Sequence, residues 1–381
     1  MDFDRTGDQR LLAENALEFA RTRLNGSFPQ RLAERRFGRE EWGLCGEFGL
    51  LGASVPQEYG GLGLDALSTA LAVEQFARGC RDTGLVFSAC AHLLACVMPL
   101  VEHADEDTRR RVLPGLVEGR TIGANAITEA EAGSDVYALS TTAIRDGQGY
   151  VLSGVKTFVT NAPVADLFLV YAKTDPADGY LGISAFLVDR ETPGLSVGEP
   201  LINGGLVTSP VASVQFNDCR VAESARLGAE GDGRLIFNAS MRWERTCLFA
   251  AYLGVMDRQL EEVIHHVRER RQFRKPLARQ QSVAHRVADM KMRLEGARLL
   301  LYRSCWILDK GFHSDLDVSL AKLAVSEAAI QSGLDAIHLH GAMGVIEDSG
   351  VDRLLRDAIP SAIFSATSEI HRDLIARRLG L

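Results

Sequence analysis

The sequence predicts an α+β fold in three parts: an N-terminal helical domain over residues 1–120, a central β-domain over 121–228, and a C-terminal four-helix bundle over 229–381. Apolar residues recur at helical spacing in the first and last parts. The middle part consists of short β-branched and aromatic runs separated by Gly, Pro, Asp and Asn, a pattern typical of strands. A chain of 381 residues also exceeds one typical core, which favours several domains or layers.

The N-terminal part is predicted to contain five helices and a glycine-rich loop at residues 59–63. The helices are expected near 11–20, 40–51, 67–79, 84–100 and 107–117. The run Gly84–Leu100 is the most apolar of the chain, but its 17 residues include His92, so a buried helix fits it better than a membrane span. We expect a structural role for His92.

The central part is predicted to be an antiparallel β-domain that forms a small barrel. Strands are expected within 121–131 and at 150–152, 158–160, 167–171, 183–188 and 212–216. A turn is expected at Ser153-Gly154, after the second of these strands. In the C-terminal part, helices are expected at 233–268, 282–310, 315–341 and 350–379.

Composition narrows the function classes. The chain is 46% hydrophobic and 24% charged, which is typical of a globular protein, and its net charge of −8 argues against nucleic acid and anionic membrane surfaces as partners. The seven cysteines form no CxxC pair and mostly lie in apolar runs, so neither disulfides nor a metal site is expected. The acidic, polar N-terminus carries no secretory signal. We therefore expect a cytoplasmic protein in a reducing compartment.

One carboxylate stands out in the predicted long helix Asn238–Arg258. Glu244 shares a helix face with apolar neighbours, including Met241 and Leu248. Burial disfavours the charged form of a carboxylate and raises its pKa, which suits proton abstraction near neutral pH. A structural glutamate paired with an Arg or Lys elsewhere in the chain explains the same pattern. The helix alone leaves both interpretations open.

Three further segments carry possible binding chemistry. In Ala126–Asp135, a strand opens into a Gly-Ser turn whose N–H groups and hydroxyls can bind an anionic or carbonyl-rich ring system. In Lys156–Asn161, strand alternation places Phe158 and Thr160 on one face, where they can stack on and hydrogen-bond to a planar heterocycle. Five basic side chains in residues 268–275 suit a diphosphate. Taken alone, the first segment is equally explained by a capped strand-turn and the third by a solvated helix end. An ordinary half-buried strand is the better explanation of the second segment alone.

Together, in this order and at this spacing, the segments resemble the acyl-CoA dehydrogenase family. TEAEAGSD is close to the family's TEPxAGSD, VLSGVKTFVTNAP is similar to its strand beside the flavin, and RRQFRKP with Gln281 resembles its RxQFGxP…Q segment. The resemblance covers essentially the whole chain. It implies bound FAD, a homotetramer built from dimers, and removal of the α-proton of a thioester with hydride transfer to flavin N5.

The resemblance also implies the contacts of individual residues. The flavin and its phosphates would be lined by Ile127, Thr128, Gly133 and Ser134, and the isoalloxazine flanked by Phe158 and Thr160. The adenine diphosphate of FAD in a neighbouring subunit would be reached by Arg270, Phe273, Gln281, His338, Gly341 and Gly344. The cofactor would also be approached by Thr367 and Glu369. Substrate contacts are expected from Ser134 and Arg245.

The sequence departs from the family pattern near its C-terminus. The family's YEGTSQI, whose Glu is the base, is replaced by Phe364–Ile370, which places Ser365 at the position of that base. An unassisted serine cannot abstract this proton. One branch of the family, including isovaleryl-type enzymes, carries its base in a Glu-Arg pair on the long helix, and Glu244-Arg245 matches that pair. Glu244 is therefore the predicted base. Further departures are His338 for Gln, and Ala342 and Arg274 for Gly.

Within the family, the segments Cys80–His92, Trp243–Phe249 and Ile359–Ser365 look like those of the L-prolyl-carrier-protein dehydrogenases of pyrrole-forming specialised metabolism. This likeness implies a carrier protein whose phosphopantetheine arm bears a prolyl thioester, oxidised to a dehydroprolyl or pyrrolyl thioester. The alternatives are an isovaleryl-type acyl-CoA dehydrogenase, a dehydrogenase of another carrier-bound acyl group, a flavin monooxygenase, and a non-catalytic scaffold on the same fold.

Overall fold

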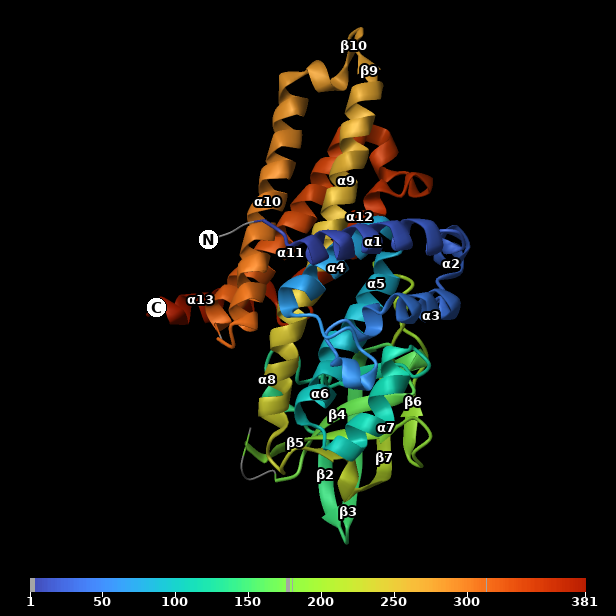
Figure 1. Cartoon of the computed structure of the whole chain (residues 1–381), viewed down its shortest axis with the longest axis vertical. Helices are drawn as coiled ribbons and strands as arrows, with labels where there is room; N and C mark the ends of the chain where they lie inside the picture. Colours follow the sequence, from blue (N-terminus) through green and yellow to red (C-terminus); the bar gives the residue numbers. More distant parts are fainter. Residues whose placement is uncertain (1–3, 176–178, 180, 313) are drawn as a thin grey trace.

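The computed structural model describes residues 4–175, 179, 181–312 and 314–381. Helices of the N-terminal part lie between the β-sheet and the C-terminal helices (Figure 1). At the end of the molecule away from the sheet, a long helical arm within residues 250–309 projects and ends in a β-hairpin. The N-terminal helices are α1 (Gly7–Arg23), α2 (Phe28–Glu34), α3 (Arg39–Phe48), α4 (Ala66–Gly79), α5 (Thr83–Cys90), α6 (Met98–His103) and α7 (Glu106–Val117).

The most apolar run is a core helix, as predicted. A π-helical turn, Ala91–Val97, joins α5 to α6, and the resulting stretch Thr83–His103 is long and apolar enough to cross a membrane; 89% of its most apolar window is nevertheless buried inside the protein. His92 is buried in this stretch, where its Nδ1 accepts from Gly123 N (2.9 Å) and its Nε2 donates to Leu116 O (3.1 Å). Burial lowers the pKa of His92 to about 4, so the ring is neutral and structural.

The central part is one sheet with the strand order β6-β7-β3-β2-β4-β5-β8, and β1 pairs alongside β4. Its strands are β1 (Gly123–Ala126), β2 (Thr142–Asp146), β3 (Gly149–Thr160), β4 (Leu167–Lys173), β5 (Ile183–Asp189), β6 (Leu195–Val197), β7 (Val211–Ala222) and β8 (Arg226–Leu227). The β-domain is confirmed. Across the described strands, however, the hydrogen-bonded path is open between β6 and β8, so no pairing closes the predicted barrel. The pairs β1–β4 and β2–β4 are parallel, which corrects the prediction of a wholly antiparallel sheet.

The predicted turn at Ser153-Gly154 is wrong, because β3 continues through it. Its register against β7 shifts between Leu152 and Gly154, which marks a β-bulge. Gly154 has φ 152°, and a Cβ there would lie 2.5 Å from the Thr141 hydroxyl. A glycine inside a strand pattern therefore marks a bulge and a close approach here.

The C-terminal part consists of helices joined by irregular turns. Its elements are α8 (Gly233–Trp243), α9 (Ala250–Glu269), the hairpin strands β9 (Arg271–Gln272) and β10 (Lys275–Pro276), α10 (Gln281–Asp309), α11 (Asp315–His340), α12 (Val351–Ala358) and α13 (Ser368–Arg378). The predicted single helix over 233–268 is interrupted by a π-helical turn at Glu244–Leu248. The single helix over 350–379 is wrong, because Ser365 (φ 56°) and Ala366 (φ 75°) adopt left-handed backbone between α12 and α13.

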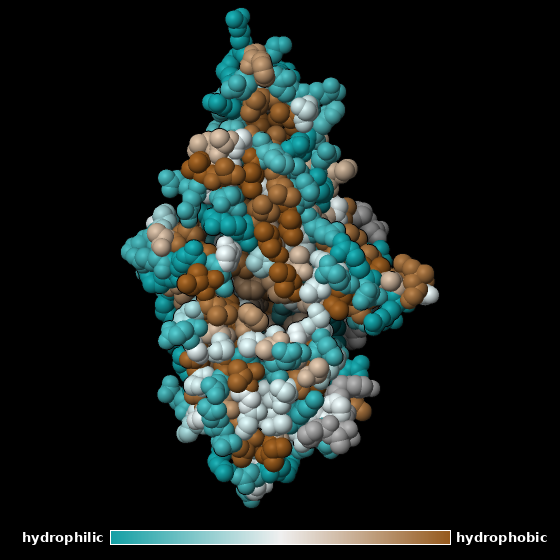
Figure 2. All heavy atoms as spheres, turned by 180° about the vertical axis from the view of Figure 1, so that it is seen from behind, coloured by the Kyte–Doolittle hydropathy of each residue, from teal (hydrophilic) through white to brown (hydrophobic). Residues whose placement is uncertain are grey.

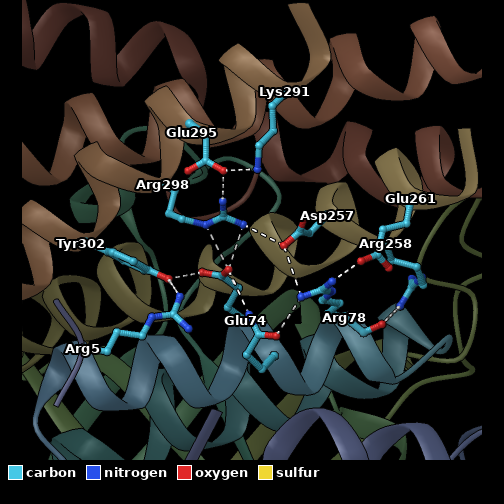
Figure 3. A network of polar contacts seen from close by, with 11 residues as sticks. Arg5, Glu74, Arg78, Asp257, Arg258, Glu261, Lys291, Glu295, Arg298 and Tyr302 are labelled. Carbon is cyan, nitrogen blue, oxygen red and sulfur yellow. Dashed lines mark hydrogen bonds and ion pairs between the residues drawn. The ribbon is translucent and has the colours of Figure 1, made fainter. Parts of the chain in front are cut away.

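A buried charge network joins the N-terminal part to the bundle (Figure 3). Arg298 of α10 pairs with Glu74 of α4 and with Asp257 of α9, both at 3.0 Å. The Tyr302 hydroxyl also donates to Glu74 (2.6 Å), and Arg5 from the start of the chain donates to Tyr302 (3.1 Å). Four segments far apart in the sequence are therefore joined in one network of polar contacts around Arg298, Tyr302 and Glu74. All seven cysteines are free and buried, as predicted.

Candidate active site

Glu244 is the first residue of the π-helical turn between α8 and α9. Its side chain is buried, with 9% of the residue exposed, and burial raises its pKa. Arg245 and Lys322 lie close enough for their charges to oppose this rise, but neither forms an ion pair with Glu244 among the described residues. The interpretation as a structural glutamate held by an Arg or Lys is therefore not supported by a direct contact.

The direct partner of Glu244 is Ser365, whose hydroxyl donates to the carboxylate oxygen Oε1. Ser365 occupies the position of the usual base in the YEGTSQI pattern, so the serine and the helix-borne glutamate meet at one point. Ala366, at the position of that pattern's glycine, retains a left-handed backbone. The family resemblance implies that the Glu244 carboxylate reaches the point served by the usual base, but the hydrogen bond with Ser365 was not predicted.

Aromatic packing fixes the segment that carries Ser365. The ring centroid of Phe364 lies 4.8 Å from that of Phe87 on α5. It also lies 5.4 Å from the ring centroid of Phe249 and 6.3 Å from that of Tyr252. These rings come from three different elements and form one cluster. The segment before α13 is therefore anchored in the core although it lacks regular structure.

The loop after β1 is held by a buried ion pair. Lys156 on β3 is fully buried; its ammonium group pairs with Glu129 (2.7 Å) and donates to Ile127 O (3.1 Å). Glu129 also accepts from the backbone N–H groups and hydroxyls of Ser140 and Thr141, at 2.6–3.0 Å. Burial acts to raise the pKa of Glu129, but these contacts outweigh it and lower that pKa to about 2. Burial lowers the pKa of Lys156 to about 8. Both residues lie within the recognised motifs, but no role was predicted for either.

Exposed groups gather beside this ion pair. Thr157 N donates to Thr128 O (2.8 Å), which brings β3 against the loop and Phe158 next to Thr128. Phe158 is 66% exposed and has φ 54°, so the strand alternation predicted to pair it with the half-buried Thr160 is broken there. Gly133 and the exposed Ser134 follow in the same loop. An aromatic face, open backbone groups and hydroxyls thus lie together, a combination suited to a planar polar ring system.

This exposed region adjoins the helix of Glu244. Tyr137, shortly after Ser134, donates its hydroxyl to Asn238 on α8 (3.1 Å), about two turns before Glu244. Thr367 caps α13 by accepting from Ile370 N (3.4 Å), two residues after Ser365, and Glu369 lies exposed in the first turn of the same helix. These predicted site residues therefore share one region with Glu244 and Arg245.

Arg270, Phe273 and Gln281 lie elsewhere. Arg270 directly follows α9 and lies 26 residues after Glu244, which corresponds to about 39 Å along a helix. Phe273 is 87% exposed, and it forms with Arg274 a two-residue turn in which both residues have positive φ, 49° and 65°. Such a turn favours glycine, which explains the family's glycine at the position of Arg274.

His338, Gly341 and Gly344 lie at the end of α11, near the same tip. His340 stacks on His266 of α9 with ring centroids 4.2 Å apart, and a hollow of about 720 Å³ is lined by both histidines and by Arg270. His338 and Gly341 are exposed, and a Cβ at Gly344 would lie 2.4 Å from Ile337 O. The predicted site residues therefore form two clusters: one around Glu244 and one at the distal tip.

Comparison with known proteins agrees with this architecture. The chain matches the family descriptions "Acyl-CoA dehydrogenase, N-terminal domain" over residues 6–120, "middle domain" over 124–219 and "C-terminal domain" over 231–380. It is 53% identical over 348 residues to an L-prolyl-[peptidyl-carrier protein] dehydrogenase of Pseudomonas fluorescens, covering 91% of this chain and 92% of the relative. It is 44% identical to the enzyme of that name from a Serratia species, covering 100% and 99%.

A solved structure described as PigA with FAD and proline superposes with a TM-score of 0.98 at 43% identity, covering 100% of both chains. The family descriptions together span nearly the whole chain, and the resemblance inferred from the sequence motifs is confirmed. The chain belongs to the acyl-CoA dehydrogenase family.

Proposed function

We propose that the protein is an FAD-dependent dehydrogenase that oxidises an L-prolyl group held as a thioester on a carrier protein, with Glu244 as the base. The observation that carries this proposal is a buried glutamate that has no ion-pair partner among the described residues and touches the serine at the family's usual base position. The names of the two relatives, and the FAD and proline of the similar structure, support the substrate and the cofactor.

The exposed groups around β3 fit a flavin. Phe158 presents an uncovered aromatic face, and no atom of the residues that the structure describes lies within 4 Å of a Cβ built at Gly133, which leaves room for a ligand near the loop. The flavin would be held by Ile127, Thr128, Gly133, Ser134, Phe158, Thr160, Thr367 and Glu369. Bound FAD supplies a two-electron acceptor that takes a hydride from the substrate.

The chain's own residues perform the proton chemistry. Glu244 removes the proton α to the thioester carbonyl, and its raised pKa makes it a stronger base than an exposed carboxylate. Arg245 and Lys322 lie near enough to stabilise the ionised form before the reaction. Ser134 and Arg245 are proposed to contact the substrate. Each round removes one proton and one hydride, so one round gives a dehydroprolyl thioester and two rounds give a pyrrolyl thioester.

We also propose a homotetramer built from dimers. The distal cluster of Arg270, Phe273, Gln281, His338 and Gly341 is too far from Glu244 to serve the same cofactor ring, so it would bind the diphosphate of FAD in a neighbouring subunit. Apolar side chains form a band over the bundle half of the rear face (Figure 2). On α10, the exposed apolar residues Met292, Leu299 and Trp306 recur every seven residues, a spacing suited to packing against another helix.

The domain boundaries are proposed at 120/121 and 228/229, supported by the start of β1 at Gly123 and the end of β8 at Leu227. A cytoplasmic location is proposed from the seven buried free thiols, which are typical of a reducing compartment.

The test is an anaerobic titration of the FAD-loaded protein with prolyl-carrier protein and with isovaleryl-CoA. We expect the flavin band to bleach with the prolyl thioester only. Glu244→Gln should keep its bound flavin and lose roughly 10²–10⁴-fold in rate, the usual contribution of a general base. Glu118→Gln, the same substitution at an exposed site, is the matched control. Full activity of Glu244→Gln would refute the assigned base, and bleaching by isovaleryl-CoA alone would refute the assigned substrate.

A further inference from the structure

The segment that carries Ser365 is held in an unusual conformation. Ser365 and Ala366 have φ values of 56° and 75°, in the left-handed region that non-glycine residues rarely adopt. Two consecutive residues of this kind persist only where surrounding contacts maintain them. The bend sends the carbonyl of Ser365 toward Arg245 and His371 while its hydroxyl meets Glu244.

Three side chains from three elements hold this bend. Arg245 Nε donates to Ser365 O (2.9 Å), and His371 Nε2 lies 3.1 Å from the same oxygen. Lys322 Nζ on α11 donates to Ala366 O (2.9 Å). Burial, followed by the charge of Arg245, lowers the pKa of His371 to about 4, so its neutral ring donates through Nε2–H. These contacts leave the Ser365 hydroxyl little freedom of position.

We propose that Ser365 is a positioning residue for Glu244: its hydroxyl holds Oε1 in one orientation and keeps the carboxylate ionised, so that Oε2 is free to take the substrate's proton. This inference rests on the proposed role of Glu244 as the base. The position that carries the base in the family's common pattern would thus still serve proton abstraction, but through a second residue. Arg245, Lys322 and His371 act one step further away, by fixing the loop.

The energetic need for this contact follows from burial. Glutamate has three rotatable side-chain bonds, and the hydrogen bond that the described residues make to the Glu244 carboxylate comes from Ser365. A buried carboxylate without a donor shifts toward its neutral form, which cannot act as a base. Precise placement of a base within hydrogen-bond reach of its proton is a condition for catalysis.

The charges around Glu244 define the expected pH response. Burial raises its pKa, and the bond from Ser365 is the largest opposing contribution, followed by Arg245 on the same turn and Lys322 on α11. Cys90 on α5 and Tyr171 on β4 lie near enough to feel the charge of the carboxylate, but burial raises the pKa of both, so they stay neutral. Removing the Ser365 hydroxyl therefore raises the Glu244 pKa further, and the enzyme needs a higher pH to reach its ionised, active form.

The experiment measures the rate of anaerobic flavin reduction by prolyl-carrier protein against pH. In Ser365→Ala we expect the acidic limb to move upward by about one pH unit, because a lost charge-assisted hydrogen bond corresponds to about that pKa change. At any fixed pH on the acidic limb of both proteins the rate should fall roughly 10-fold, while the substrate's dissociation constant stays unchanged. Ser365→Gly also removes the hydroxyl but suits the left-handed backbone, so it gives the same shift even if Ala is poorly tolerated. In Ser365→Cys the thiol is a weaker donor, so the acidic limb should lie between those of the wild type and Ser365→Ala.

Ser361→Ala is the matched control, because this serine lies in the same segment and its buried hydroxyl finds no hydrogen-bond partner within the described part of the chain. It should keep the wild-type profile. A wild-type rate and pH profile in both Ser365→Ala and Ser365→Gly would overturn the inference. If Glu244→Gln is inactive in that case, only the role of Ser365 fails. If Glu244→Gln is active, the proposed base itself fails.

Discussion

The buried pair of Glu129 and Lys156 allows a quantitative prediction about the cofactor loop. Glu129→Gln removes the counter-charge of a lysine with no exposed surface. Lys156 already has its pKa lowered to about 8, so without Glu129 it will lose its proton near neutral pH. The larger cost is the loss of the ionised Glu129 carboxylate, whose pKa is lowered from 4.5 to about 2 in the folded protein; this contributes stability at every pH above its ordinary pKa, and each pKa unit corresponds to about 1.4 kcal/mol. We expect the free energy of unfolding to fall by about 3–4 kcal/mol, in line with other broken buried pairs.

The assay is urea unfolding of the FAD-loaded protein, together with titration of FAD into the apoprotein. FAD affinity should also fall, because Lys156 holds the carbonyl of Ile127 at the start of the cofactor loop. The double variant Glu129→Gln/Lys156→Met should recover part of the loss, since it leaves no unpaired charge. Glu223→Gln, at a half-exposed ion pair, is the matched control and should cost less than about 1 kcal/mol. A loss below about 1 kcal/mol in Glu129→Gln, with unchanged FAD affinity, would refute this reasoning.

Four further outcomes are expected. Turnover should fall as pH decreases through the raised pKa of Glu244, because only the ionised carboxylate is a base; a flat acidic limb in a pH–rate profile would contradict this. Phe158→Ala should weaken FAD binding roughly 10-fold, the loss of about 1.4 kcal/mol of ring contact, while leaving apoprotein unfolding unchanged; equal affinity by titration would contradict it. Arg270→Ala should lower FAD affinity although α9 stays folded, measured by flavin release and circular dichroism; unchanged release would argue against a cofactor role for the distal tip. Arg298→Ala should lower the free energy of unfolding by about 3–5 kcal/mol in urea, because it leaves Glu74 buried without its cation, and a change below about 1 kcal/mol would contradict it.

The order of helices, strands and helices could be predicted because each part has its own apolar period. Helix starts also carry local signals: Thr6 and Gln9 form a capping box at α1, and Asp65 caps α4. The irregular points were missed. Ser365 and Glu244 are 121 residues apart, and no local pattern encodes their contact.

The candidate site was predicted unevenly for the same reason. Local motifs indicated Glu244 and Phe158. In the structure Glu244 is buried, which suits a base, and Phe158 is exposed, which suits contact with a flavin. The roles themselves, with those of the other site residues, stay predictions. Glu129 and Lys156 were inside recognised motifs, but their pairing depends on how the loop folds over β3, which strand alternation does not predict. The parallel pairing of β1 with β4 joins strands more than 40 residues apart, and no local pattern indicates it either.

The two π-helical turns, Ala91–Val97 and Glu244–Leu248, pack against each other in the interior. A π-turn accommodates one residue more than regular winding does, so deleting one residue from Glu244–Leu248 would restore the α-helix. The helix beyond the turn would then keep its direction, whereas the same deletion within the regular winding of α9 would rotate everything downstream by about 100° around the helix axis. In that second case Arg270, at the far end, would point in a new direction although no atom near it had been altered. The π-turn is therefore the point along this helix where losing one residue does least to the aim of the remote hairpin, although Glu244 itself lies in that turn.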